Sequence, residues 1–224
     1  MDKKEQKIFI GKALDPAKRT QIWKFFQGMC RIVITVAFRF RAYNVENVPR
    51  TGAVILASNH QSYLDPALVG IALQRPVGFL ANAYLFRVPL FGRVIWNLHA
   101  FPVERGKGDR AAINTAIELL NRGYALNVFP EGTRSPDGEI KPLERGILLL
   151  TRKTGAPVLP IAIDGAYDAW PKGRKLFRPH PVHLIYGKLI DPTKMDNQEF
   201  MDTLDREIRR LHAELVSRRG EMKL

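Results

Sequence analysis

The sequence predicts an α/β fold, a mostly parallel mixed sheet flanked by helices, with an amphipathic helical segment at its amino end. Two observations carry this prediction. Short apolar runs that fit strands buried on both faces recur along the chain, and segments of helical periodicity lie between them, as in sheets with crossover helices. The length of 224 residues, 46% of them hydrophobic, fits one compact domain.

The segment at residues 20–41 has the periodicity of an amphipathic helix, with large apolar residues on one side and a polar stripe on the other. The apolar side comprises Ile22, Phe25, Phe26, Met29, Ile32, Val33, Val36 and Phe40, and the stripe comprises Lys24, Gly28, Arg31, Thr35 and Arg39. Arg31 interrupts the apolar run, which falls short of the ~20 residues that span a bilayer. Such a helix is typical of the membrane interface. The alternative is a helix packed on the domain core.

The predicted strands and helices alternate through the rest of the chain. The strands are residues 53–57, 124–129 and 158–163, and the intervening helices are residues 66–73, 110–121 and 143–153. A last helix follows the capping candidates Asp196 and Asn197. Its apolar face, expected to pack on the sheet, is Phe200, Leu204, Ile208, Leu211 and Leu215.

His60 and Asp65 follow the first predicted strand, with four residues between them. On a helix, positions five apart point about 140° away from each other. The spacing therefore favours a strand end, a turn and a helix that starts at Asp65, which lets the two side chains meet. Asp65 before Pro66 also has the pattern of a helix N-cap with proline at the first helical position.

A histidine held by a carboxylate is suited to general base catalysis. Imidazole has an unperturbed pKa near 6.5, so it is mostly neutral at neutral pH. The carboxylate fixes the tautomer and stabilises the imidazolium that forms. Two downstream segments, residues 101–106 and 129–135, each carry an arginine, whose planar fork suits phosphate. The pattern predicts a base beside a bound phosphate.

These motifs resemble the glycerolipid acyltransferase family, whose bacterial type member acylates 1-acylglycerol-3-phosphate. The family's first motif matches Asn59, His60 and Asp65. The second resembles residues 101–106 (Phe-Pro-Val-Glu-Arg-Gly), the third matches residues 129–135 (Phe-Pro-Glu-Gly-Thr-Arg-Ser), and the fourth resembles residues 158–162. The resemblance runs from about residue 45 to residue 190. Together with the amphipathic segment it leads us to divide the chain into an interfacial segment, residues 1–43, and an acyltransferase domain, residues 44–224.

The resemblance implies that His60, oriented by Asp65, is the general base on the acceptor hydroxyl. The activated oxygen would attack the thioester carbonyl of acyl-CoA or acyl-carrier protein directly. The reaction would need no other cofactor, and with 1-acylglycerol-3-phosphate as acceptor its product would be phosphatidic acid. Arg105 and Arg134 would bind the acceptor phosphate. The residues that shape this pocket would be Glu131, Gly132, Thr133 and Ser135. From the residues alone, Arg105 also fits a solvated surface charge, and Glu131 equally fits an ion pair with Arg134 or a loop hydrogen bond.

The chain departs from the common family pattern near the predicted phosphate site. Asn82 and Tyr84 stand where a lysine and a glutamate are frequent, and Glu144 stands where a lysine is frequent. Losing cations there weakens the prediction of a phosphate-bearing acceptor, unless Lys107 or Lys141 compensates. A different lysolipid or another polar acceptor is the alternative.

The net charge of +13 predicts attraction to polyanions. No nucleic-acid motif occurs, so we expect a lysolipid acceptor, an acyl thioester donor and an anionic membrane as partners, with peripheral or monotopic attachment at the cytoplasmic face. Two alternatives remain open. One is a thioester hydrolase that uses the same base on water. The other is a basic binding module without chemistry, which leaves the His60–Asp65 pair without a purpose.

The single cysteine, Cys30, excludes an intrachain disulfide and fits a reducing compartment. It lies in an apolar segment and no Gly-x-Ser-x-Gly elbow occurs, so we expect no covalent acyl-enzyme. Neither a cysteine cluster nor a His-Glu-x-x-His helix is present, so we expect no metal. The remaining histidines, which we interpret as structural or surface residues, are His99, His180, His183 and His212.

Overall fold

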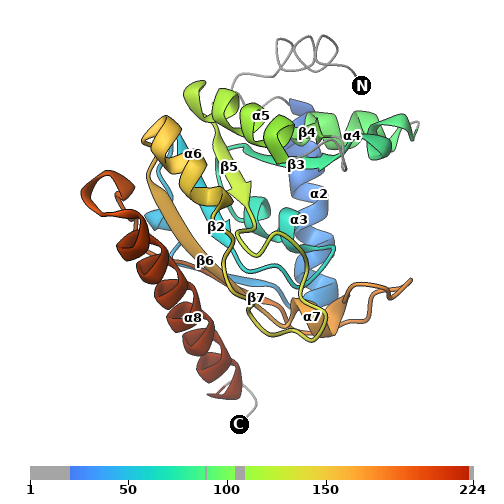
Figure 1. Ribbon diagram of the computed structural model, residues 1–224. Helices are drawn as coiled ribbons and strands as arrows, with labels where there is room; N and C mark the ends of the chain where they lie inside the picture. Colours follow the sequence, from blue (N-terminus) through green and yellow to red (C-terminus); the bar gives the residue numbers. More distant parts are fainter. Residues whose placement is uncertain (1–20, 89, 104–108, 222–224) are drawn as a thin grey trace.

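The computed structural model describes residues 21–88, 90–103 and 109–221 (Figure 1). In this part of the chain a sheet of seven strands runs in the order β1-β7-β6-β2-β5-β3-β4. The strands are β1 (Arg41–Tyr43), β2 (Val54–Ser58), β3 (Val77–Asn82), β4 (Ala100–Val103), β5 (Ala125–Val128), β6 (Val158–Asp164) and β7 (His183–Tyr186). Only β6 and β7 pair antiparallel, so the predicted mostly parallel mixed sheet is confirmed.

Helices cover both faces of the sheet (Figure 1). The helices are α2 (Gln21–Phe38), α3 (Asp65–Ile71), α4 (Phe91–Asn97), α5 (Asp109–Asn121), α6 (Gly146–Thr154), α7 (Ala166–Ala169) and α8 (Asn197–Glu221). Three short 3-10 turns accompany them, η1 (Val45–Asn47), η2 (Ala83–Arg87) and η3 (Pro192–Lys194). One apolar core joins the sheet to α2, α3 and α7, and a second joins it to α5, α6 and α8.

The centre of the sheet positions the site. Strand β2 is buried along its whole length between β6 and β5, as expected for an apolar strand covered on both faces. Val54 pairs with Ala125 and Ala57 with Val128, so β2 and β5 end together at one edge. The segments that follow these two strands, which carry the first and third motifs, therefore meet at the carboxyl edge of the sheet.

The carboxyl-terminal helix α8 has the predicted face. Phe200, Leu204, Ile208, Leu211 and Leu215 are all buried, and the helix packs along β6. Its start is capped by Asp196, whose Oδ1 accepts hydrogen bonds from the amides of Gln198 and Glu199 at 2.8 and 2.9 Å. Asn197 instead accepts from the Arg152 guanidinium at 2.8 Å.

The amino-terminal helix α2 has three faces, whereas the sequence pattern indicated two. Trp23, Ile34 and Phe38 are buried against the domain, so the expected alternative of core packing is part of the observed arrangement. The residues that face away from the protein are Phe25, Met29, Ile32, Val33 and Val36, and the polar stripe is also exposed. The two-sided interpretation was wrong because the packed face is narrow and mixes Trp23 and Phe38 with the polar Gln27, whose side-chain amide donates to the Leu73 carbonyl at 2.7 Å.

No helix in the described ranges is long and apolar enough to cross a membrane. The expected interfacial segment, residues 1–43, contains β1, which pairs with β7, so its last residues are part of the sheet. Residues 1–20 lie outside the described residues.

His99, the residue immediately before β4, has an unusual backbone conformation and an unusual environment. Its φ of +64° is a left-handed conformation that non-glycine residues adopt uncommonly. The side chain is 1% exposed, and neither ring nitrogen has a hydrogen-bond partner in the described part of the chain. Burial lowers the pKa of His99 to about 4, because the imidazolium loses its hydration. The interpretation of His99 as structural fits this position.

His99 should make the stability of the protein depend on pH. Its folded pKa of about 4 lies below the unfolded value of 6.5, so its contribution is complete above pH 6.5 and is lost as the pH falls toward 4. The loss amounts to roughly 3 kcal/mol by proton linkage. His99→Asn, which tolerates the left-handed backbone and does not titrate, should flatten this part of the curve in urea unfolding. An unchanged slope in the variant would contradict the assignment.

Candidate active site

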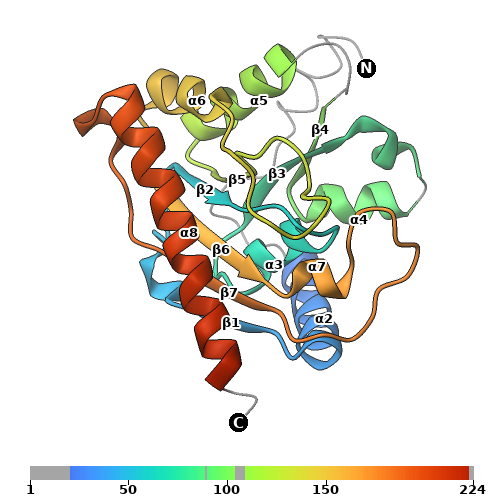
Figure 2. The ribbon, with the colours of Figure 1, turned by 60° about the horizontal axis from the view of Figure 1, so that its bottom comes forward.

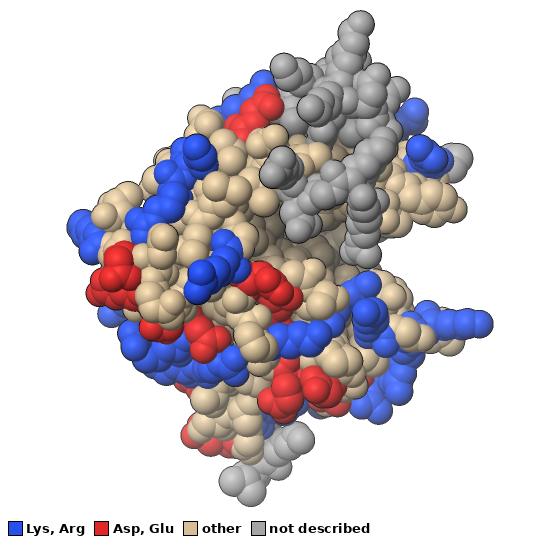
Figure 3. Space-filling view, viewed as in Figure 1, with Lys and Arg blue, Asp and Glu red and all other residues tan. Residues whose placement is uncertain are grey.

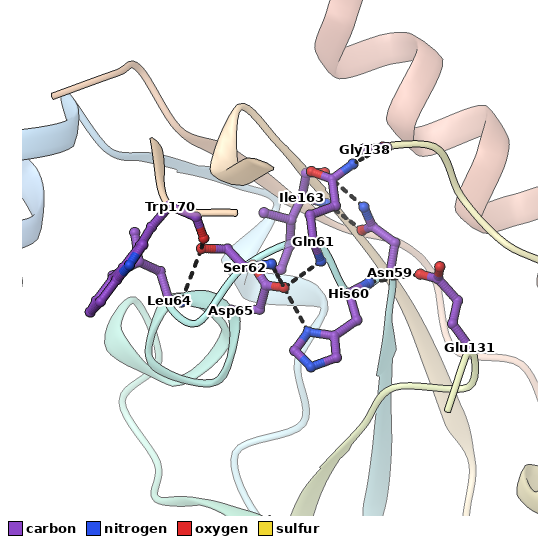
Figure 4. Close-up of polar contacts among 10 residues, drawn as sticks. All are labelled: Asn59, His60, Gln61, Ser62, Leu64, Asp65, Glu131, Gly138, Ile163 and Trp170. Atoms are coloured by element: carbon purple, nitrogen blue, oxygen red, sulfur yellow. Dashed lines mark hydrogen bonds and ion pairs between the residues drawn. The ribbon is translucent and has the colours of Figure 1, made fainter. Parts of the chain in front are cut away.

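His60 leaves the sheet at a point fixed by its neighbour Asn59. The Asn59 side chain donates to the Ile163 carbonyl at 2.9 Å and accepts from the Ile163 amide at 2.8 Å. This side chain extends the pairing of β2 with β6 beyond Ser58, where β2 ends. His60 therefore begins the turn just beyond the carboxyl edge of the sheet, as the sequence predicts (Figure 4).

One oxygen of Asp65 holds the turn and the imidazole together. Asp65 Oδ2 accepts from His60 Nδ1 at 2.7 Å and from the backbone amides of Gln61 and Ser62 at 2.6 and 2.7 Å (Figure 4). Asp65 is completely buried. Because Nδ1 faces the carboxylate, it carries the proton, and Nε2 is left as the acceptor.

The expected N-cap role of Asp65 was wrong. Helix α3 begins at Asp65 itself, Leu64 occupies the cap position, and no side chain caps the helix. The carboxylate is turned back toward residues 60–62, where it meets three donors at once, so it is not available to the amides of α3. The predicted contact between His60 and Asp65, made across a strand end, a turn and a helix start, is present.

The loop that follows β5 holds the backbone of His60 from both sides. The His60 amide donates to Glu131 Oε1 at 2.7 Å, and the His60 carbonyl accepts from the Ser135 amide at 2.7 Å. Glu131 Oε2 also accepts from the Lys141 amide at 2.9 Å. Glu131 is buried, and this burial raises the pKa of its carboxyl group. Of the interpretations that the sequence left open for Glu131, the structure shows loop hydrogen bonds, and no ion pair between Glu131 and Arg134 occurs among the described contacts.

Aromatic rings pack against the imidazole of His60 and the guanidinium of Arg134 at this edge. The His60 ring stacks on Phe129 with centroids 3.8 Å apart and an angle of 15° between the planes. The Arg134 guanidinium lies over the Tyr63 ring, 3.7 Å from its centroid. Residues of the first motif thus contact residues of the third motif at both positions, and the imidazole and the guanidinium lie on the same edge of the sheet.

A cavity of about 1150 Å³ opens beside these residues, and Figure 3 shows a hollow on the face seen in Figure 1. This volume is slightly above the usual range for small-molecule sites, about 300–1,000 Å³. His60, Tyr63, Gly132, Thr133 and Arg134 line it. Most other walls are apolar and come from α2, α3, β3, α5 and α6. No described residue bonds to His60 Nε2, which is therefore available to a ligand.

The remaining predicted residues differ in their positions. Ser135 is buried and does not line the cavity, because its hydroxyl donates to Asp137 Oδ1 and accepts from the Gly138 amide. Gly132 has a φ of +68°, which explains a glycine at this turn. Arg105 and Lys107 lie outside the described residues. The three departures from the family pattern, Asn82, Tyr84 and Glu144, all line the cavity.

Asn127 is a cavity residue that the sequence analysis missed. It is 4% exposed, lines the cavity, and neither atom of its amide has a partner in the described part of the chain. Phe129, on which the His60 ring stacks, directly follows β5 and also lines the cavity. A polar residue inside an otherwise apolar strand, Ala125–Val128, was the available signal.

Across residues 21–88, 90–103 and 109–221, no group of three or more His, Cys, Asp or Glu side chains is arranged to hold a metal ion.

Comparisons with known proteins agree on one family. The sequence model of the Acyltransferase family matches residues 39–164. The chain is 29% identical to the 1-acyl-sn-glycerol-3-phosphate acyltransferase of Bacillus subtilis over 75% of its length and 81% of the relative's. It is 31% identical to the enzyme of the same name from Pseudomonas aeruginosa, over 72% of its length and 65% of the relative's. The chloroplastic enzyme of Brassica napus is 31% identical, but the chain spans 45% of its length.

A solved structure shares the fold. The crystal structure of the 1-acyl-sn-glycerophosphate (LPA) acyltransferase PlsC from Thermotoga maritima superposes with a TM-score of 0.75 at 29% sequence identity. The match covers 96% of this chain and 83% of that one.

The Glu131 carboxylate should be required for the stability of the site. In Glu131→Gln one of the two amides of His60 and Lys141 loses its acceptor, because an amide side chain offers only one acceptor oxygen and turns a donor toward the other. We expect a loss of about 1–3 kcal/mol in the free energy of unfolding, measured in urea. Glu139→Gln, at an exposed position in the same loop, is the matched control and should change stability by less than about 0.5 kcal/mol. Equal free energies of unfolding for Glu131→Gln and Glu139→Gln would contradict the role of Glu131 in holding the His60 and Lys141 amides.

Proposed function

Because the chain belongs to the Acyltransferase family, we propose that it transfers a fatty acyl group from an acyl thioester to the hydroxyl of a lysolipid, most specifically 1-acylglycerol-3-phosphate, giving phosphatidic acid. The names of the curated relatives support this acceptor. One observation carries the proposal. His60 is oriented by the buried Asp65 at 2.7 Å and lines a large apolar cavity, with Nε2 available to a ligand.

His60 Nε2 takes the proton of the acceptor hydroxyl as the new carbon–oxygen bond forms. The oxygen attacks the thioester carbonyl directly, and Asp65 stabilises the imidazolium that results. Collapse of the tetrahedral intermediate breaks the carbon–sulfur bond. The thiolate of coenzyme A or of a carrier protein leaves and takes the proton from the imidazolium, which restores the neutral base. The half-buried Cys30 takes no part in this route.

The acceptor phosphate binds Arg134 in this proposal, and Arg105 supplies the second cation. Arg134 lines the same cavity as His60, and its guanidinium lies over the Tyr63 ring, 3.7 Å from the centroid. The guanidinium offers several donors in a fixed fork, which suits phosphate oxygens. Holding the phosphate at a fixed point orients the hydroxyl toward the base. Gly132 and Thr133 line the cavity beside Arg134. Ser135 does not line it but shapes the loop through its bonds to Asp137 and Gly138.

Within residues 1–43, the part before β1 acts as the interfacial segment in our proposal, whereas β1 itself joins residues 44–224 in the catalytic domain. The attachment is peripheral, at the cytoplasmic face of the membrane. Helix α2 supports this because it exposes large apolar side chains next to the cationic Lys24 and Arg31 while its third face packs on the domain. Anionic lipid headgroups would add about 1 kcal/mol for each lysine or arginine near the surface.

Replacing His60 should abolish transfer without unfolding the protein. The expected loss of kcat for His60→Ala and His60→Gln is about 10²–10⁴-fold, the usual contribution of a general base. The assay follows a labelled acyl thioester in the presence of a panel of lysolipids, with both donor types. His212→Ala, on the distant helix α8, is the control and should retain activity.

Three outcomes of this assay would overturn the proposal. Free fatty acid as the only product would identify a thioester hydrolase. Absence of any turnover by the wild-type protein would favour a non-catalytic binding module. Full activity of His60→Ala would remove the base from the mechanism.

Replacing Arg134 should weaken the binding of acceptors that carry a phosphate. We expect KM for 1-acylglycerol-3-phosphate to rise about 10- to 100-fold in Arg134→Ala, corresponding to the loss of a charged hydrogen bond of about 1.5–3 kcal/mol. A neutral monoacylglycerol should show no such change. Arg134→Lys should recover part of the effect, since it keeps the charge and loses the fork. Unchanged kinetics with the phosphate-bearing acceptor would reject the assignment.

A further inference from the structure

The loop at residues 171–178, between α7 and β7, combines exposed apolar side chains with clustered cations. Leu176 is 77% exposed and Phe177 is 49% exposed. The exposed cations of the same loop are Lys172, Arg174, Lys175 and Arg178. An isolated exposed leucine is unremarkable in a soluble protein, but apolar side chains surrounded by lysine and arginine have the composition of a segment that contacts an anionic lipid surface.

The loop has a defined structure at its base. The Trp170 indole donates to the Arg174 carbonyl at 2.9 Å, and the Arg178 amide donates to the Ala169 carbonyl at 2.9 Å. The Ser62 hydroxyl, from the turn between His60 and Asp65, donates to the Trp170 carbonyl at 2.7 Å (Figure 4). The apolar tip is therefore presented at a fixed position relative to the candidate active site.

Aromatic contacts connect the loop with both α2 and the cavity. Phe177 packs against Phe38 at the end of α2, with centroids 5.4 Å apart, and against Trp170 at 6.1 Å. Trp170 contacts Tyr63 at 5.4 Å, and Tyr63 in turn lies under Arg134. Figure 2 shows the loop after α7 curving past the end of α2. Phe38 belongs to the buried face of α2. These contacts therefore hold the loop against the end of α2 on one side and beside Tyr63 at the cavity on the other.

The opposite side of the mouth is apolar as well. Tyr84 and Leu85 in η2 are exposed and line the cavity, and Val88 is exposed immediately after them. In Figure 3 the hollow lies between two parts of the molecule that project to the right, and both carry lysine or arginine side chains. Figure 1, drawn from the same side, places the loop after α7 in the lower of these parts and the η2–α4 region in the upper one.

We propose that the 171–178 loop is a second lipid-contacting element, distinct from α2, which seats the cavity mouth against an anionic membrane surface. Leu176 and Phe177 enter the interfacial region. Lys172, Arg174 and Lys175 meet lipid phosphates, whereas the Arg178 guanidinium is bonded to Asp168 at the base of the loop. The exposed apolar side chains at the tip, Leu176 and Phe177, favour a membrane over an acidic carrier protein, whose docking would need the cations alone. This inference rests on the proposed function only in that the acceptor is a membrane lipid.

Vesicle sedimentation tests the contact directly, without any substrate. The probes are vesicles of phosphatidylcholine with and without phosphatidylglycerol. We expect Leu176→Ser to weaken partitioning to the anionic vesicles at least about tenfold, and Lys172→Gln and Lys175→Gln to weaken it about fivefold each. Leu189→Ser is the matched control, because Leu189 is also an exposed leucine but lies next to Ile190, which pairs with the start of β6 at the opposite edge of the sheet. It should bind as the wild type does.

A second measurement uses the unaltered protein. Lysine and arginine make the loop a target for trypsin, so cleavage within residues 171–178 should slow when anionic vesicles are added and not when only phosphatidylcholine vesicles are added. Wild-type partitioning by the three loop variants, or an equal loss in Leu189→Ser, would overturn the proposal. So would loop variants that bind vesicles normally but raise KM for an acyl-carrier protein donor, which would identify a carrier docking surface.

Activity separates this inference from the proposed function. With a short-chain acceptor that is soluble as a monomer, Leu176→Ser should have the turnover of the wild type. With the same headgroup in anionic vesicles, its turnover should fall in parallel with its partitioning. Equal turnover on vesicles would overturn the role of the loop while leaving the chemistry intact, and a wild-type protein inactive on both acceptors would instead overturn the proposed function.

Discussion

The site depends on one buried carboxylate oxygen. Asp65 Oδ2 accepts from the His60 imidazole and from the amides of Gln61 and Ser62, all within 2.7 Å. A fully buried charge is tolerated only where such donors surround it. The same three bonds close the turn after β2, so the residue that orients the imidazole also shapes the backbone that carries it. Without this oxygen, the buried amides of Gln61 and Ser62 would have no hydrogen-bond acceptor, and the tautomer of the His60 imidazole would no longer be fixed.

Two motifs distant in the sequence form one rigid unit around that turn. His60 is bonded through its amide to Glu131 and through its carbonyl to Ser135, and its ring stacks on Phe129. The polar chemistry lies at the carboxyl edge of the sheet, where β2 and β5 end together, while the cavity behind it is largely apolar. This combination suits an amphiphilic acceptor, whose headgroup meets fixed polar groups and whose chain requires an apolar wall.

Periodicity predicted the three central strands, the helices between them and the buried face of α8, because each of these elements packs with a single regular pattern. It missed β1, β3, β4 and β7. Strand β1 has three residues and β4 contains a proline, and short edge strands are stabilised by their neighbours more than by their own composition. For α2 the pattern located the helix and misassigned its faces, since only the tertiary structure shows which side is buried against the rest of the domain.

The sequence by itself determined the pairing of His60 with Asp65, because both residues belong to one turn and local geometry brings them together. It also determined the fold class and the family to which its motifs are similar. Only the tertiary structure decided that Glu131 braces the His60 backbone across 71 residues of sequence, that Asn127 faces the cavity, and that Phe177 packs against Phe38. These contacts join segments far apart in the chain, and they follow from the order of strands in the sheet, which no local pattern of residues encodes.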